Sequence, residues 1–501
     1  MIFLVACLLG LTVNAPAATL WQTWQAARVH DPEFKAAAAV LAKARAAKPA
    51  ALSALLPQIN GSLSRTYNNG ASEALQYYGQ NQILPVSQSE NIGTSFWQIE
   101  LDQPLFDWAA IKNLEAASLD VAVAASNYQA ALDKLAVKVV TDYVGVLSAR
   151  AALDATRETV KGFAEQSREA DARYRAGTTG VIGADAAKAA LESARGQLLA
   201  ARQQLTAAEF ALRALTAGLS AGAEATLPVN YGVAVSGTQQ DWLDRALADN
   251  PRLAAARLGA RADAKRIGAA DSGYMPTLSL ALLHNQQITS GSASFSIPGQ
   301  VVPSPADGNI TGNEIALQLK WNFFAGGATH AKVEQARAQA DQSRATAATT
   351  RLDVAREVKT RYAALLVDAQ QLKTLRAAVT AARDAVKATT LGVSAGVRTE
   401  DDLVTQRERL LAAEQSLNVA IATSVQDEIT LSQVTGTLTG ARLHQLSNKL
   451  AAAPTSASAT ASAGASLLAN PSAEDSTSKL APTPHRRINR NRFSKRNGVN
   501  P

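Results

Sequence analysis

Residues 311–324 read TGNEIALQLKWNFF, and their side chains alternate between two chemical kinds. One set is apolar: Ile315, Leu317, Leu319, Trp321 and Phe323. The intervening set is mostly polar: Ala316, Gln318, Lys320 and Asn322. A period of two predicts a β-strand with one apolar and one polar face. The segment around Trp97 and Ile99 alternates in the same way and predicts a second strand of this kind.

Proline and glycine positions show that the chain contains an internal duplication. Pro57 recurs as Pro276, and Gly177 recurs as Gly396, with an offset of 219 residues each time. The pairs Asp31-Pro32 and Asn250-Pro251 have the same offset. We therefore expect two tandem repeats, 18–218 and 241–437, separated by a connector at 219–240 and followed by a segment at 438–451. Each repeat should contain two strands around a polar loop, with strands at about 58–68, 93–106, 276–287 and 312–324 and loops at about 69–92 and 287–311.

Long helices are predicted after each strand pair. No proline occurs between Pro104 and Pro228, or between Pro305 and Pro454. Apolar residues recur there at spacings of three and four, which is typical of helices packed as coiled coils. We expect helices at about 107–176, 184–218, 327–393 and 399–436, with hairpin tips at the two duplicated glycines. Each repeat should also open with a helix, because Asp and Asn cap helices well and proline suits the first turn. The expected fold class is mainly α with β.

Composition and charge exclude some classes of protein. The chain has 501 residues, of which 47% are hydrophobic, so it is not a disordered chain. The formal net charge is +7, and residues 452–501 carry seven basic and two acidic residues, or +5. The rest of the chain is almost neutral, which does not support a nucleic-acid-binding surface. Residues 452–501 are rich in Ser, Ala and Pro and have a basic end, so we expect this tail to be disordered.

Residues 1–17 resemble a secretory signal peptide. An apolar run covers 2–13, and Ala15-Pro16-Ala17 provides a cleavage site, although no basic residue precedes the run. Cys7 leaves open the alternative of lipoprotein processing. No later segment holds the ~18 apolar residues of a membrane-spanning helix. If the protein enters a membrane, it should do so as β-strands.

Four strands cannot close a transmembrane barrel, which needs at least about eight. If the predicted strands span a bilayer, several copies of the chain must share one barrel. The alternative is an ordinary soluble antiparallel sheet.

The sequence does not predict an enzyme. The five histidines have no metal-ligand spacing. The sequence at 218–222 fits G-x-S-x-G, but a nucleophile elbow joins a strand to a helix, whereas this motif follows a predicted helix. We therefore expect no catalytic residues, no cofactor and no metal.

Four motifs carry a resemblance to a known family. They are Leu55-Leu56-Pro57-Gln58, Gln103-Pro104-Leu105-Phe106-Asp107, WNFFAGG at 321–327, and Ala395-Gly396-Val397-Arg398-Thr399. With the duplicated element order, they closely resemble the TolC family of outer-membrane efflux and secretion channels. The resemblance implies a homotrimer whose twelve strands form one β-barrel in the outer membrane of a Gram-negative bacterium. An α-helical barrel would continue it into the periplasm, with 219–240 and 438–451 as its equatorial region.

The resemblance also implies a gate at the periplasmic end. Arg398 and Asp402 fall where the family has its tip arginine and first aspartate, and Thr405 falls where some members carry a second aspartate. Asp185 matches the acidic residue of the first tip, and Glu400 and Asp401 add carboxylates. Three of these residues, Arg398, Asp402 and Thr405, are spaced to share one helical face, so threefold symmetry would form rings around an axis. The alternative is a solvated helix face with pairs such as Asp402 and Arg398.

The implied function is a passive exit duct in a tripartite export system. Its partners would be a periplasmic adaptor, an inner-membrane transporter driven by ATP or protons, and outer-membrane lipid, with no nucleic acid. The tips favour type I secretion slightly over drug efflux, and they should dock the adaptor through Gly177, Gly180, Gly396, Val397 and Thr399. An alternative from a different class is a periplasmic coiled-coil adaptor or structural spacer, which would explain the heptads and the export signal.

Overall fold

The computed structural model describes residues 18–78, 82–178, 180–219, 221, 225, 227–233 and 236–451. The predicted signal peptide with Cys7, and the predicted disordered tail at 452–501, lie outside these residues. The chain divides into two compact units, 1–453 and 454–501, and every helix and strand described below belongs to the first.

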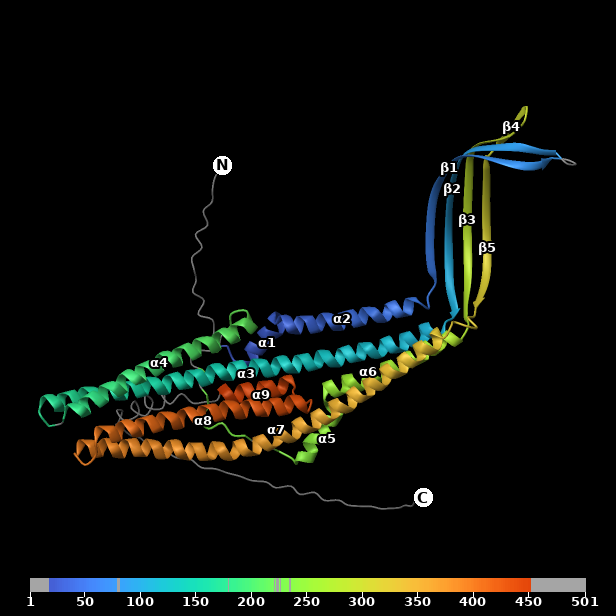
Figure 1. Ribbon diagram of the computed structural model, residues 1–501. Helices are drawn as coiled ribbons and strands as arrows, with labels where there is room; N and C mark the ends of the chain where they lie inside the picture. The colour runs from blue at the N-terminus through green and yellow to red at the C-terminus, as the bar shows by residue number, and fades with distance from the viewer. Residues whose placement is uncertain are drawn as a thin grey trace, which may run out of the picture. The chain divides into compact units, whose positions relative to one another are not determined.

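Helices make up most of the first unit (Figure 1). They are α1 Leu20–His30, α2 Pro32–Ser53, α3 Trp108–Arg175, α4 Val181–Thr216, α5 Gln239–Asp249, α6 Pro251–Asp271, α7 Ala328–Ser394, α8 Glu400–Val434 and α9 Gly440–Ala451, with the short 3-10 helix η1 Ser272–Tyr274. Among the described residues, no helix is both long and apolar enough to cross a bilayer.

The duplicated Asp/Asn-Pro pairs begin helices α2 and α6. The Asp31 carboxylate accepts a hydrogen bond from the Phe34 backbone N–H at 2.7 Å, and Asn250 Oδ1 accepts one from Leu253 at 2.9 Å. Each cap satisfies an amide that would otherwise lack a partner in the first helical turn. The same sequence signal therefore starts the equivalent helix in both repeats.

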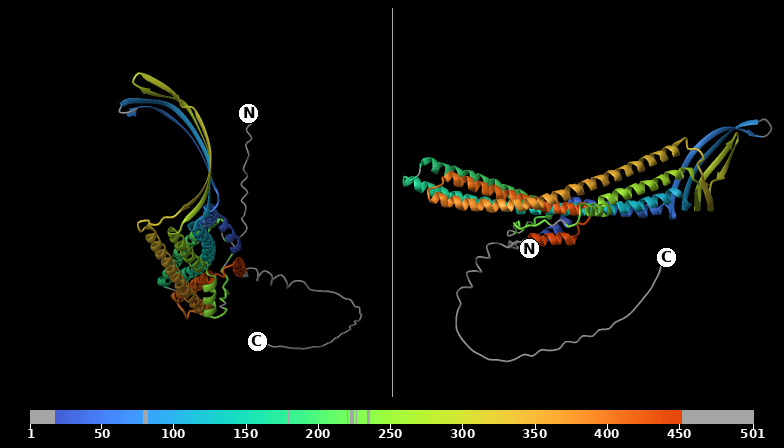
Figure 2. Two further views of the ribbon diagram at one scale, coloured as in Figure 1. Left: turned by 90° about the vertical axis from the view of Figure 1, so that its right-hand side faces the viewer. Right: turned by 90° about the horizontal axis from the view of Figure 1, so that it is seen from below.

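The strands form one antiparallel sheet. They are β1 Gln58–Tyr78, β2 Gln82–Phe106, β3 Thr277–Ile297, β4 Gln300–Pro305 and β5 Gly308–Lys320. The order is β1-β2-β3, and both β4 and β5 pair with the far edge of β3 (Figures 1 and 2). Within the described chain, the outer edges of β1 and β5 have no strand partner. The predicted fold class, mainly α with a β-sheet, is confirmed.

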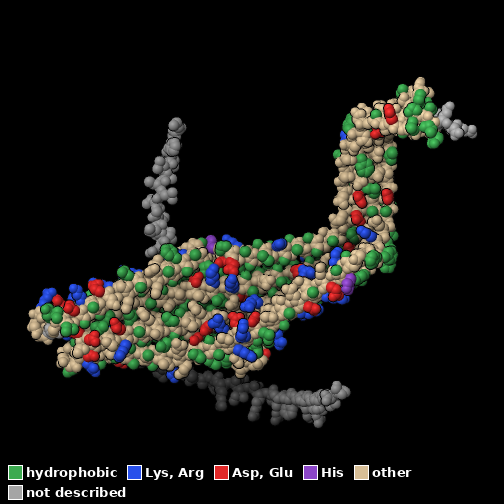
Figure 3. All heavy atoms as spheres, in the orientation of Figure 1, with side chains coloured by type: hydrophobic (Ala, Val, Ile, Leu, Met, Phe, Trp, Pro, Cys, Tyr) green, Lys and Arg blue, Asp and Glu red, His purple; other side chains and the backbone are tan. Residues whose placement is uncertain are grey.

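One face of the sheet is apolar over its helix-proximal half. The register places Leu63 opposite Trp97, and Leu282 opposite both Leu101 and Ile315. Leu63 is 80% exposed and Ile315 is 79% exposed, whereas Trp97 and Leu101 of the central strand β2 are half-buried. Figure 3 shows hydrophobic side chains on the sheet together with a few charged ones, and charged side chains of both signs spread over the helices. An apolar face of this size on one chain needs lipid or another protein to cover it.

The predicted polar loops at 69–92 and 287–311 are wrong. β1 and β2 pair continuously from Gln58 with Asp102 to Tyr78 with Gln82, and β3 extends to Ile297. Gly, Ser and Asn have low strand propensity, but the ladder uses backbone groups that every non-proline residue carries. Pairing with a neighbouring strand therefore determines the conformation of these segments, and the strands are longer than predicted.

The predicted strand at 312–324 also ends too late. β5 stops at Lys320, and residues 321–327 turn into α7. The Trp321 indole N–H donates to the Tyr274 carbonyl at 3.1 Å, and Gly326 and Gly327 adopt positive φ angles of 61° and 85°. Two glycines in the left-handed region allow the chain to reverse from strand to helix within a few residues.

The two helical hairpins, α3–α4 and α7–α8, pack against each other through α3 with α8 and α4 with α8 (Figures 1 and 2). The main core lies where α1, α9 and the connector meet these hairpins. It includes Leu147 of α3, Leu212 of α4, Ile421 of α8 and Leu443 of α9, all at most 2% exposed. The tips at 176–180 and 395–399 lie outside this core.

We predict that Gly436→Ala destabilises the helical unit more than Gly396→Ala. Both glycines have positive φ, 67° and 73°, so both variants suffer similar backbone strain. A Cβ at Gly436 would also lie 2.4 Å from the Asp249 carbonyl oxygen, whereas a Cβ at Gly396 would meet nothing within 4 Å. The clash should add about 1–3 kcal/mol. Circular dichroism on heating should show a lower midpoint for Gly436→Ala; equal midpoints would contradict this packing.

Candidate functional site

The two helical hairpins end in the same backbone motif. Gly177 and Gly396 have φ angles of 70° and 73°. The Thr178 N–H donates to the Arg173 carbonyl at 3.0 Å, and the Val397 N–H donates to the Gly392 carbonyl at 2.9 Å. This six-residue closure is the Schellman motif, which satisfies carbonyls left open at a helix end. The duplication therefore extends to the hydrogen bonds of both tips.

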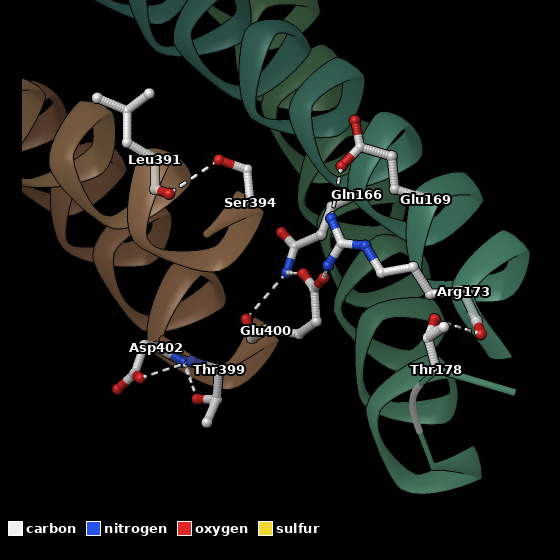
Figure 4. A network of polar contacts seen from close by, with 9 residues as sticks. All are labelled: Gln166, Glu169, Arg173, Thr178, Leu391, Ser394, Thr399, Glu400 and Asp402. Atoms are coloured by element: carbon white, nitrogen blue, oxygen red, sulfur yellow. Dashed lines mark hydrogen bonds and ion pairs between the residues drawn. The ribbon is translucent and has the colours of Figure 1, made fainter. Parts of the chain in front are cut away.

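A capping box begins α8 immediately after the second tip. The Thr399 hydroxyl accepts a hydrogen bond from the Asp402 N–H at 3.1 Å, and the Asp402 carboxylate accepts one from the Thr399 N–H at 3.0 Å (Figure 4). The hydrogen bond that its carboxylate accepts from the Thr399 backbone N–H comes first among the causes that lower the pKa of Asp402; the Thr399 side chain and, to a smaller extent, the charge of Arg398 act in the same direction. The carboxylate is therefore ionised at neutral pH, and the cap is lost only as the pH falls through the lowered pKa.

The predicted partners of Asp402 do not bind it within one chain. Its hydrogen bonds go to Thr399, and the described residues show no hydrogen bond or ion pair from Asp402 to Arg398 or Asp185. The spacing of Thr399 and Asp402, an acidic residue three positions after a threonine at the start of a helix, is the sequence signal for this capping role. Asp402 therefore also stabilises the start of α8.

Glu400 points in a different direction from Asp402 and contacts the other repeat (Figure 4). Gln166 Nε2 of α3 donates to the Glu400 carbonyl at 2.9 Å and to its carboxylate at 3.1 Å. Arg173 of α3 forms an ion pair with the same carboxylate and another with Glu169 at 3.3 Å. The Glu400 side chain is only 10% exposed. We call Glu400, Gln166, Arg173 and Glu169 the Glu400 network; it ties the start of α8 to the end of α3.

Arg407 extends the contact between α8 and α3. The Arg407 guanidinium occupies the space beside Gly162: a Cβ added at Gly162 would lie 1.6 Å from Nη1 of Arg407. The Cζ atom of Arg407 lies 6.0 Å from the centroid of the Phe163 ring. Burial lowers the pKa of Arg407, although the nearby carboxylates, Glu165 first, oppose that shift. Among the described residues its Nε has no hydrogen-bond partner. The glycine within α3 thus provides room for a large cation from α8.

The other predicted gate and docking residues lie at or near the tips. Asp185, Asp401, Arg398 and Val397 are exposed, and Thr405 is half-buried on α8. Gly180 is the N-cap of α4, where no side chain caps the helix. The structure therefore brings Val397, Arg398, Thr399 and Asp402 together in the second tip, and it places Asp185 on the other hairpin.

Sequence reasoning missed Gln166, Arg173, Arg407 and Gly162. Three are ordinary polar residues in a long helical pattern, and their partners lie in the other repeat, so no local pattern identifies them. Gly162 was the one detectable signal because glycine inside a helix costs ~1 kcal/mol and usually has a packing reason.

No group of three or more His, Cys, Asp or Glu side chains in the described part of the chain could hold a metal ion.

The family model for "Outer membrane efflux protein" matches residues 23–218 and 242–437. The chain belongs to this family. The two matched segments coincide with the two repeats, and the resemblance to TolC-type channels is confirmed. The protein is accordingly an outer-membrane protein with a periplasmic portion, and the alternative of a periplasmic adaptor is not supported.

Similar proteins cover most of the chain. "Outer membrane protein TolC" of Escherichia coli (strain K12) is 24% identical over 452 residues, covering 89% of each chain. "Alkaline protease secretion protein AprF" of Pseudomonas aeruginosa is 23% identical, covering 83% of this chain and 84% of its own. The solved structure of the Campylobacter jejuni CmeC outer membrane channel matches with a TM-score of 0.65 and 16% identity, covering 86% and 89%. At 16% identity, the similarity to the CmeC structure shows a shared fold.

Proposed function

We propose that three copies of this chain form an exit duct of a tripartite export system. The supporting observation is the sheet with one apolar face and two unpaired edges, β1 and β5, in a chain of this family. Pairing β5 of one copy with β1 of the next would satisfy the backbone groups that lipid cannot. Three copies give a closed barrel, continued by the long helices toward an adaptor and an inner-membrane transporter.

A detergent-solubilised trimer is the expected form of the protein. Native mass spectrometry of the full chain in detergent should give a mass of three chains, because open sheet edges and an exposed apolar face make the single chain unstable in water. A monodisperse monomer that stays soluble without detergent would reject the duct.

We propose further that the Glu400 network keeps the periplasmic end closed. It joins the α7–α8 tip to α3 of the same chain, so the tip cannot move outward without breaking it. Asp402, with Asp401, Arg398 and Thr405 nearby, would then contribute charged or polar rings around the threefold axis. Asp185 would contribute from the first tip. A ring of three carboxylates favours cations.

We predict that Arg173→Gln and Asp402→Asn have different effects in planar-bilayer recordings. Arg173→Gln removes an ion pair of about 1 kcal/mol per chain, which should shift the equilibrium toward the open state about fivefold for each chain and raise conductance. Asp402→Asn removes three charges per trimer, which should lower cation selectivity with little change in conductance.

Lys161→Gln is a suitable control because Lys161 pairs with Glu158 on the exposed face of the same helix. Unchanged conductance for Arg173→Gln would show that the Glu400 network does not hold the gate. Unchanged selectivity for Asp402→Asn would place the constriction elsewhere, with Asp401 as the next candidate.

The tips are the proposed adaptor-docking surface. Val397 is 75% exposed at the second tip, next to Gly396 and Thr399, and Gly177 and Gly180 bound the first tip. Type I secretion is our preferred cargo route, supported by the likeness to a protein named for alkaline protease secretion. Drug efflux is the second candidate, supported by the family's name.

We predict that a photoreactive amino acid at position 397 crosslinks a periplasmic adaptor in cells. The same residue at position 29, where Val29 is 62% exposed on α1, should not, because α1 lies away from the tips. Mass spectrometry of the complex would identify the transporter: an ATP-driven secretion transporter supports type I secretion, and a proton-driven pump supports efflux. Equal crosslinking at both positions would contradict tip docking.

A further inference from the structure

A pocket distant in sequence from both tips lies between α5, α7, α8, α9 and the connector. Its volume is about 380 Å³. An apolar wall is formed mainly by Trp242, Leu365 and Leu431, and a basic wall by Arg245, Arg442 and Lys449. We call it the α5–α9 pocket. Ligand sites often have this size and combine an apolar wall with a few polar groups.

The pocket has an excess of positive charge. Glu428 is the one carboxylate that lines it. It accepts hydrogen bonds from the Tyr231 hydroxyl and from Arg442 at 2.7 Å, and it forms a longer ion pair with Lys449 at 3.5 Å. Glu428 is 8% exposed, so this carboxylate is a buried anchor for the connector and α9. Three basic side chains therefore share the pocket with one carboxylate, and two of them, Arg442 and Lys449, are its ion-pair partners.

Arg245 is the basic residue of the pocket that does not pair with Glu428, and its charge interacts with the Asp241 carboxylate one turn earlier on α5. Its guanidinium carbon lies 5.5 Å from the centroid of the Trp242 ring, and it forms no ion pair with any carboxylate in the described parts of the chain. The indole itself is fixed, because Trp242 Nε1 donates to the Ser236 carbonyl at 3.0 Å. A fixed aromatic ring beside an unpaired guanidinium provides both a surface for stacking and a partner for an anion.

We propose that the α5–α9 pocket binds a small organic carboxylate that has an apolar or ring-shaped portion. The ring portion would lie against Trp242 and Leu365, and the carboxylate would reach Arg245 and Lys449. Such a ligand could be a free aromatic acid or a fragment of the cell wall whose peptide carries carboxylates. The proposal does not depend on the duct or its gate, since the pocket lies near the main core.

Isothermal titration of the full chain in detergent tests the proposal. The probes are 3-phenylpropionate and N-acetylmuramyl-L-alanyl-D-isoglutamine, and the neutral 3-phenylpropionamide is the ligand control. We expect at least one carboxylate to bind and the amide to bind at least tenfold more weakly. Tighter binding of 3-phenylpropionate indicates a free acid, and tighter binding of the muramyl peptide indicates a cell-wall fragment.

The matched variants are Arg245→Gln in the pocket and Arg261→Gln on the exposed part of α6. A hydrogen bond to a charged group is worth roughly 1.5–3 kcal/mol, so Arg245→Gln should weaken carboxylate binding about tenfold or more. Arg261→Gln should leave it unchanged. The proposal is overturned if neither carboxylate binds, if the amide binds equally well, or if the two variants behave alike.

Discussion

The backbone of β1 and β5 imposes the constraint on which the rest of the structure depends. These two strands each have one edge without a partner in the described chain. In the proposed duct they would lie in lipid, where every N–H and C=O group must be hydrogen-bonded. The helices follow the same order as the strands: α2 leads into β1, β2 into α3, α6 into β3, and β5 into α7. Contacts run from α2 to α3, from α3 to α6 and from α6 to α7. Any association that pairs the sheet edges therefore also brings α7 of one copy toward α2 of the next.

Apolar burial is distributed unevenly along the helices. The main cluster gathers α1, α3, α4, α8, α9 and part of the connector, and the buried Glu428 binds Tyr231 and Arg442 at this level. Near the tips a small cluster of Phe163, Leu191 and Ala194 is supplemented by the polar Glu400 network. Polar contacts can be exchanged for water at lower cost than a packed apolar core, so the tips are the part of the hairpins best suited to move. This gradient is what a gated end requires.

Much of the fold followed from the sequence, whereas contacts between the repeats did not. Proline and glycine spacing indicated two repeats, and the alternation at 311–324 located a strand, although β5 ends at Lys320. The polar strands at 69–92 could not be predicted because their conformation depends on pairing with neighbours. Among the three neighbouring acids, the spacing from Thr399 marks Asp402 as a helix cap, which is a local contact. Glu400 and Asp401 cannot be distinguished in this way: only the packing of α8 on α3 shows that Glu400 contacts the other repeat whereas Asp401 is exposed.

The two tips share a turn but differ in how the next helix starts. α8 begins with the Thr399–Asp402 capping box, whereas α4 begins at Gly180 with no side-chain cap. The capping box adds two hydrogen bonds that hold the start of α8, and the start of α4 lacks both. In the proposed trimer, the six tips at the periplasmic end would therefore alternate between three stiff and three pliable ones. A partner that binds only the stiffer tips would find three equivalent positions around the ring. The two repeats of each chain therefore need not give six equivalent binding positions.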